Sequence, residues 1–103
     1  MRKDPRHHIY ERDNWTCQYC GRGGIESFED WNEAWLAIDH IMPKKHGGSD
    51  EESNLVVACH TCNSVKAAEM CSSIAEAKEI IARKNEGRKR WFQKFVANDS
   101  ADT

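Results

Sequence analysis

Two Cys-x-x-Cys pairs constrain the fold of this chain more than any other feature of its sequence. The pairs are Cys17/Cys20 and Cys59/Cys62, which leave Cys71 as the fifth cysteine. Two such pairs can close one tetrahedral site around Zn²⁺, an ion that accepts four thiolate ligands. Because four protein ligands leave no open coordination position, we expect a structural zinc that links the N-terminal segment to the middle of the chain. Cys71 is expected to be a small, buried apolar residue.

The length and composition also favour a structural metal. The chain has 103 residues, of which 39% are apolar and 31% are charged, so we expect a single domain spanning 1–103 with a small core. Domains of this size often need a metal or disulfides in addition to the core. The opening residues, MRKDPRHH, contain no apolar leader segment, and no apolar run reaches the length of a bilayer. We therefore expect a cytoplasmic protein without a membrane partner, in which paired cysteines favour metal over disulfides.

The charge is distributed unevenly. The formal net charge is −2, which gives no global basic field for coating DNA. Acidic residues gather in 26–33 and 50–52, and basic residues gather in 83–94. Each cluster taken alone is expected to be a solvated face, and the uneven distribution remains compatible with a nuclease.

The first half of the chain predicts two helices. Residues Asp4–Asp13 suit a short helix, with Asp4 as the N-cap and Pro5 at the first helical position. Residues Ser27–Leu36 place aromatic side chains at helical spacing. We expect these aromatic side chains (Phe28, Trp31 and Trp35) to supply core volume, which so short a chain needs.

The second half predicts a hairpin and further helix. Two β-type runs, Ala37–Met42 and Leu55–Ala58, are joined by a polar loop rich in glycine, which is typical of a hairpin with a long loop. Thr61–Met70 has a helix-compatible composition. A last helix is expected from Ser73, where Ser73-x-x-Glu76 forms a capping box, over about 73–97.

Four polar residues around the hairpin form a candidate active site. They are Asp39, His40, Asn54 and Asn63. Each has an ordinary structural explanation: a satisfied histidine in a strand, a turn-forming asparagine or a helix cap. However, a carboxylate inside an apolar strand is costly without a partner. Taken together, at these spacings and beside a zinc site, the four residues favour a catalytic function.

The sequence resembles the HNH endonucleases over about 9–70. The resemblance rests on Asp39-His40-Ile41-x-Pro43, Gly47-Gly48, Asn54-Leu55, Cys59-x-x-Cys62-Asn63 and Lys66, and on the lead-in Ile9-Tyr10-Glu11-Arg12-Asp13-x-Trp15-x-Cys17-x-Tyr19-Cys20-Gly21. It implies an α+β fold: a small ββα-metal, treble-clef-like domain with a structural zinc site of four cysteines and flanking helices. Asn63 stands where many members of the family have histidine, which makes this chain an HNN variant.

The resemblance also implies catalytic roles. His40 would be the general base that activates the attacking water, and Asp39 and Asn63 would hold one divalent ion. Asn54 would fix the long loop so that a backbone carbonyl orients the His40 ring. Lys66 would either bind the substrate phosphate or be an exposed, solvated lysine. Because the two ligand residues offer hard oxygen atoms, we expect Mg²⁺ or Mn²⁺ as the catalytic ion, with Zn²⁺ only structural.

The resulting hypothesis is a metal-dependent DNA endonuclease of the HNH type. The alternative is a zinc-knuckle module that binds nucleic acid or protein without catalysis, and Asp39 and His40 argue against it because a binding module does not need this pair. RNA remains open as a substrate beside DNA. The sequence also leaves open a homodimer, a recruiting protein partner and a phage, restriction or mobile-element origin.

Overall fold

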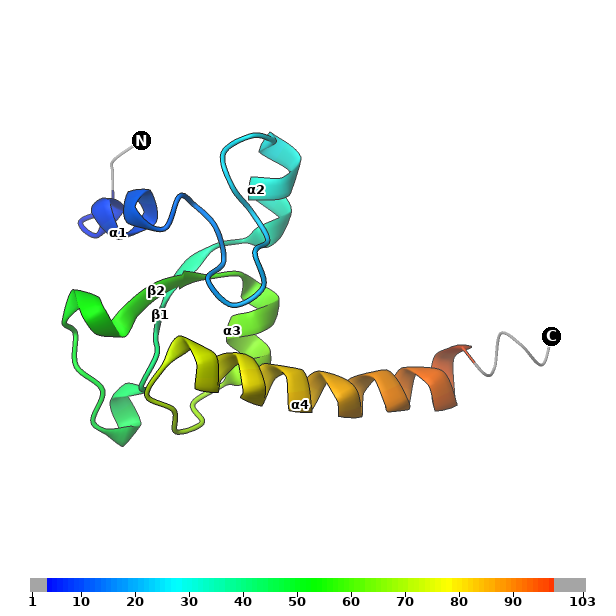
Figure 1. Ribbon diagram of the computed structural model, residues 1–103. Helices are drawn as coiled ribbons and strands as arrows, with labels where there is room; N and C mark the ends of the chain where they lie inside the picture. The colour runs from blue at the N-terminus through cyan, green and yellow to red at the C-terminus, as the bar shows by residue number, and fades with distance from the viewer. Residues whose placement is uncertain (1–3, 98–103) are drawn as a thin grey trace.

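An antiparallel pair of short strands lies at the centre of the protein. The computed structural model describes residues 4–97 (Figure 1). Strand β1 spans Ala37–His40 and strand β2 spans Leu55–Ala58, with Asp39 opposite Val56 and His40 opposite Leu55. The predicted hairpin is therefore confirmed, although β1 ends two residues earlier than expected. The connecting loop contains two 3₁₀ turns, Lys44–His46 and Glu52–Asn54.

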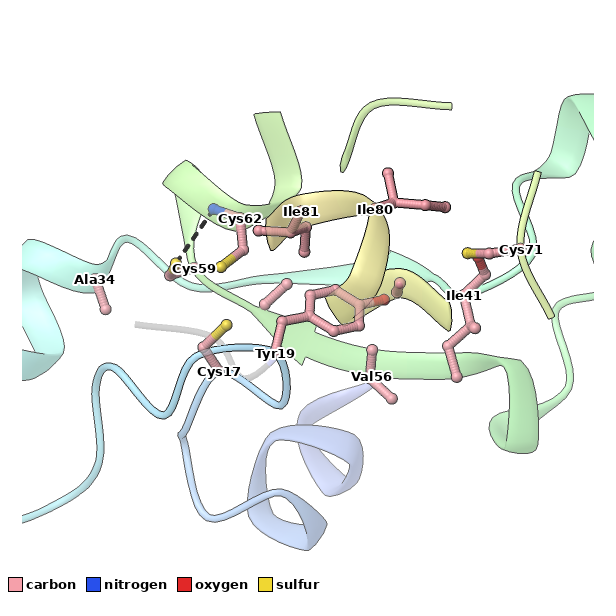
Figure 2. Packing of buried hydrophobic residues seen from close by; sticks show 12 residues of the cluster. Cys17, Tyr19, Ala34, Ile41, Val56, Cys59, Cys62, Cys71, Ile80 and Ile81 are labelled. Atoms are coloured by element: carbon pink, nitrogen blue, oxygen red, sulfur yellow. Dashed lines mark hydrogen bonds between the residues drawn. The ribbon is translucent and has the colours of Figure 1, made fainter. Parts of the chain in front are cut away.

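Helices cover the strands from both sides, which gives the expected α+β class. Their bounds are α1 His7–Arg12, α2 Phe28–Ala34, α3 His60–Lys66 and α4 Ile74–Phe92. All four residues of β2 are buried. Ile9 of α1 packs with Leu55 and Val57 on one side of the strand, and the isoleucines of α4 belong to the cluster with Val56 on the other side (Figure 2). Burial on both faces explains why β2 is a continuous apolar run. None of the helices within residues 4–97 is long and apolar enough to span a membrane.

Helix α1 begins later than the sequence suggested. The Asp4 carboxylate accepts a hydrogen bond from the backbone N–H of Arg6 at 2.7 Å, and the backbone N–H of His7 donates to the Asp4 carbonyl at 2.9 Å. Asp4 and Pro5 therefore form a turn that precedes the helix. The expected start of the helix is therefore wrong by two residues, because Arg6 and not Asp4 is the N-cap.

The prediction that the aromatic residues of α2 belong to the core is wrong. The exposed fractions are 68% for Phe28, 42% for Trp31 and 74% for Trp35. Helix α2 lies at the edge of the molecule (Figure 1) and reaches the core through Ala34, which is 1% exposed. Helical spacing predicts that side chains share a face, but it does not determine whether another element covers that face.

Helix α4 follows the predicted pattern closely. The Ser73 side chain accepts a hydrogen bond from the backbone N–H of Glu76 at 3.1 Å, as expected of an N-cap. The Glu76 carboxylate instead accepts from the backbone N–H of Ser72 at 3.2 Å, so the capping box is displaced by one residue. The helix passes through Gly87 and continues as a π-helical turn over Gln93–Ala97. Its second half extends beyond the rest of the molecule (Figure 1).

Helix α3 is shorter than the predicted segment Thr61–Met70. It ends at Lys66, because Ala67 adopts a positive φ of 54° that breaks the helix. The following segment returns the chain to α4. Cys71 lies in this segment, is 1% exposed and donates its S–H to the Ile41 carbonyl at 3.0 Å, so its predicted burial is confirmed.

Candidate active site and zinc site

The four paired cysteines come together as predicted. Their sulfur atoms all lie within 4.8 Å of one another, and the Sγ atoms of Cys20 and Cys59 are 3.7 Å apart. A tetrahedron with Zn–S bonds of about 2.3 Å has sulfur–sulfur edges of about 3.8 Å. A disulfide needs a separation of about 2.05 Å, and all five cysteines are free. The geometry and the thiolate donors therefore fit a zinc ion.

A cation would offset the charge repulsion among the thiolates of this cluster. Burial, followed by the charge of the Cys17 thiolate, raises the pKa of the Cys62 thiol far above its usual value. The backbone N–H of Cys62 donates to the Cys59 sulfur at 3.4 Å, but amide dipoles alone cannot offset several neighbouring thiolates. A divalent ion would offset them, and it would tie the turn around Cys17 to the start of α3.

The carboxylate of Asp39 is held by two buried groups from distant parts of the sequence. The Tyr19 hydroxyl donates to its Oδ2 atom at 2.7 Å, and the Lys66 ammonium lies 3.2 Å from the same oxygen. Burial, followed by the hydrogen bond to Asp39, raises the pKa of Tyr19 well above its usual value, so the phenol remains a donor. Tyr19 lies between Cys17 and Cys20, and it therefore connects the zinc site directly to Asp39.

Lys66 is not the exposed lysine that one reading of the sequence suggested. Its side chain is 0% exposed, and its ammonium donates to the backbone carbonyl of His40 at 3.0 Å in addition to pairing with Asp39. Helix α3 thereby holds the end of β1 through one side chain. The ammonium is occupied by these partners, so the predicted contact with substrate phosphate would require Lys66 to leave both of them.

The ring of His40 is oriented by a side chain that the sequence analysis missed. Its Nε2 atom lies 2.8 Å from Asp50 Oδ1, and the other Asp50 oxygen accepts from Lys44 at 3.1 Å. The hydrogen bond to His40, followed by that to Lys44, lowers the pKa of Asp50. A backbone carbonyl was expected in this position, so that expectation is wrong. Asp50 was assigned to a solvated acidic cluster because its sequence position alone does not place it opposite His40.

Asn54 fixes the hairpin loop in the predicted way. Its Oδ1 atom accepts from the backbone N–H of Met42 at 2.9 Å, and its amide donates to the carbonyls of Met42 at 3.1 Å and Ser49 at 2.9 Å. Gly48 makes this closure possible, because a Cβ atom there would lie 1.7 Å from the Met42 carbonyl oxygen. Asn54 therefore holds both ends of the segment that carries Asp50 toward His40.

Asn63 is half-buried on α3, three residues before Lys66. Residues three apart share one face of a helix, and Lys66 shows that this face is turned toward the end of β1. Within residues 4–97, neither the Asn63 side chain nor Asp39 Oδ1 takes part in a hydrogen bond. A carboxylate and an amide oxygen left without partners fit a hard divalent cation.

Comparison with known proteins agrees with this geometry. The sequence pattern of the family described as HNH endonuclease matches residues 17–69, just over half of the chain. The match includes the four clustered cysteines and every predicted site residue from Asp39 to Lys66. Neither the curated proteins nor the solved structures contain a significant match. Members of this family are generally nucleases, which act on nucleic acids. This chain, with its hairpin, its following helix and its four-cysteine cluster, belongs to the HNH endonuclease family.

Proposed function

We propose that the protein is a metal-dependent endonuclease that hydrolyses phosphodiester bonds in DNA. The proposal is supported chiefly by one observation: Asp39 and His40, at the end of β1, lie against the helix that carries Asn63, and Lys66 connects the two elements. A module that only binds nucleic acid does not need an acid–base pair in this position. The family match supports a nuclease in general, and the choice of DNA and of the catalytic residues belongs to the proposal.

His40 acts as the general base through its Nδ1 atom. Asp50 accepts a hydrogen bond from the Nε2–H group of His40, which leaves Nδ1 unprotonated and able to take a proton from the attacking water. Asp50 also stabilises the imidazolium that forms, as a carboxylate does for histidine in other hydrolases. The hydrogen bonds of Asn54 keep the loop, and hence Asp50, in place.

Asp39 and Asn63 would hold the catalytic ion through their side-chain oxygens. An ion bound there would supply charge stabilisation for the scissile phosphate and the leaving 3′ oxygen, and the expected products would carry 5′-phosphate and 3′-hydroxyl ends. Hard oxygen ligands favour Mg²⁺ or Mn²⁺ for this position, while the four cysteines take Zn²⁺. Tyr19 and Lys66 keep the Asp39 carboxylate at a fixed position and leave its second oxygen for the ion.

Plasmid cleavage tests the proposal. The zinc-loaded protein is incubated with supercoiled DNA in Mg²⁺, in Mn²⁺, in Zn²⁺ alone or with EDTA, beside His40→Ala and the control His8→Ala. His8 is an exposed histidine of α1 that contacts Glu52, so its removal is expected to leave the rate unchanged. Loss of the general base should reduce the rate on the order of 10²–10⁴-fold without loss of bound zinc.

The outcomes separate the proposal from its alternatives. Nicking that depends on Mg²⁺ or Mn²⁺ and disappears in His40→Ala supports it. Cleavage that survives the substitution contradicts the assignment of the base, and activity with Zn²⁺ alone contradicts the assignment of the ion. Binding without cleavage of any DNA would favour a zinc-knuckle binding module. A parallel assay with RNA decides which nucleic acid is the substrate.

A further inference from the structure

The outer part of α4 carries an exposed aromatic face. We define the arm as residues 87–97, which extend beyond the rest of the molecule (Figure 1). Trp91 is 60% exposed, and Phe92 and Phe95 are about half exposed. Trp91 follows Ile80 by 11 residues and Phe92 follows Ile81 by 11 residues, which is close to three helical turns. Phe95 follows Phe92 by three residues, so all three aromatic residues continue the helix face that buries Ile80 and Ile81 closer to the domain. The apolar face of α4 therefore extends into the arm, where no other part of residues 4–97 buries it.

A second exposed aromatic face lies on α2. It consists of Phe28, Trp31 and Trp35, and the rings of Phe28 and Trp31 are 6.0 Å apart. We call α2 with these residues the acidic helix, because exposed carboxylates accompany them and no lysine or arginine occurs in residues 25–36. The carboxylates belong to Glu26, Glu29, Asp30 and Glu33.

The arm has the opposite charge. Residues 87–97 contain four exposed cations and no acidic residue; the cations are Arg88, Lys89, Arg90 and Lys94. The Lys94 ammonium lies 5.2 Å from the centre of the Phe95 ring, so at least one cation borders the aromatic face directly. The two surfaces thus match in kind, aromatic with aromatic, and complement each other in charge.

We infer that the arm of one molecule packs on the acidic helix of a second copy of this chain. The arm cannot reach the acidic helix of its own molecule, because α4 is a continuous helix and the two surfaces lie apart (Figure 1). Each copy carries one arm and one acidic helix, so reciprocal exchange gives a closed, two-fold symmetric dimer. This inference does not depend on catalysis, although such a dimer would bring two candidate active sites into one particle.

The aromatic area is sufficient for a stable dimer. An aromatic side chain buries about 150–250 Å² when fully covered, and these six are on average more than half exposed. Each can therefore lose roughly 100 Å² on association. Two reciprocal contacts would bury on the order of 1,200 Å² from the aromatic residues alone, which reaches the lower end of specific interfaces.

Charge reversal on both surfaces provides the test. The arm variant is Arg88→Glu/Lys94→Glu, and the helix variant is Glu29→Lys/Glu33→Lys. The control, Lys45→Glu/Lys78→Glu, reverses two exposed cations outside the arm. Sedimentation equilibrium of the zinc-loaded full chains gives the dimer Kd, while circular dichroism and zinc content confirm that each variant is folded.

We expect the wild type and the control to dimerise, and each variant alone to have a Kd at least about tenfold higher. An equimolar mixture of the two variants should restore the wild-type Kd, because both contacts are again between opposite charges. A chain carrying all four reversals should dimerise with itself for the same reason.

Several results would overturn the inference. A monomeric wild type would do so, and so would a mixture that fails to restore association. An effect of the arm variant without any effect of the helix variant would show that the arms meet something other than the acidic helix. An arm variant that still dimerises but loses retention of plasmid DNA would assign the arm to nucleic acid.

Discussion

Replacing Lys66 by methionine tests whether the buried ion pair holds the end of β1 in place. Methionine keeps the length and apolar stem of the side chain but removes the ammonium. Asp39, whose side chain is only 11% exposed, then loses a partner at 3.2 Å, and the carbonyl of His40 loses a donor at 3.0 Å. Removing one partner of a buried ion pair lowers the free energy of unfolding by about 3–5 kcal/mol. Because Tyr19 still donates to Asp39, we expect Lys66→Met to lower the free energy of unfolding by about 3 kcal/mol, the lower end of this range. This loss is a large part of the total stability of a small domain.

Urea denaturation followed by tryptophan fluorescence, in zinc-saturated buffer, measures this cost. Lys78→Met, an exposed lysine on α4, is the matched control and should change the unfolding free energy by less than about 0.5 kcal/mol. A double-mutant cycle with Asp39→Asn measures the interaction energy between Lys66 and Asp39. We expect the double variant to be no less stable than either single variant, with a coupling of at least about 2 kcal/mol. A loss below about 1 kcal/mol for Lys66→Met, or additive losses in the cycle, would refute the reasoning.

Three further predictions concern stability. Tyr19→Phe should cost about 1–2 kcal/mol by removing the donor to Asp39. Burial and this hydrogen bond raise the pKa of Tyr19. The stability that the Tyr19 phenol contributes is therefore complete below its pKa in the unfolded chain, about 10, and is lost at higher pH. The urea midpoint of the wild type should fall more steeply above about pH 10 than that of Tyr19→Phe. Gly48→Ala places a Cβ atom 1.7 Å from the Met42 oxygen and should lower the free energy of unfolding by more than about 3 kcal/mol. Gly87→Ala, where the nearest atom to the new Cβ is 3.8 Å away, should raise the free energy of unfolding by about 0.5–1 kcal/mol because alanine favours the helix. Equal effects of the two substitutions would contradict this contrast. Chelation of zinc should lower the unfolding free energy by several kcal/mol, and a protein equally stable in EDTA and in zinc would contradict a structural role for the four cysteines.

Much of the fold follows from local features of the sequence. The two strands and the capped start of α4 at Ser73 were predicted, and the resemblance to HNH endonucleases is confirmed. These features depend on periodicity, capping chemistry and the spacing of ligand types, which are properties of short segments. The boundaries were less accurate: the end of β1 and the start of α1 each differ by two residues and the end of α3 differs by four, because the ends of elements depend on contacts with the adjoining segments.

The sequence by itself determined which residues are available for chemistry: four cysteines for one metal, and Asp39, His40, Asn54 and Asn63 around a hairpin. Only the tertiary structure decided their partners. The packing of α3 against β1 buries Lys66 beside Asp39, and the folding of the hairpin loop brings an apparently solvated carboxylate, Asp50, onto the His40 ring. The same holds for the aromatic residues of α2, which share a face that the rest of residues 4–97 leaves largely exposed. Spacing along the chain fixes which side chains share a face, whereas burial and ion pairing depend on what the rest of the fold places opposite that face.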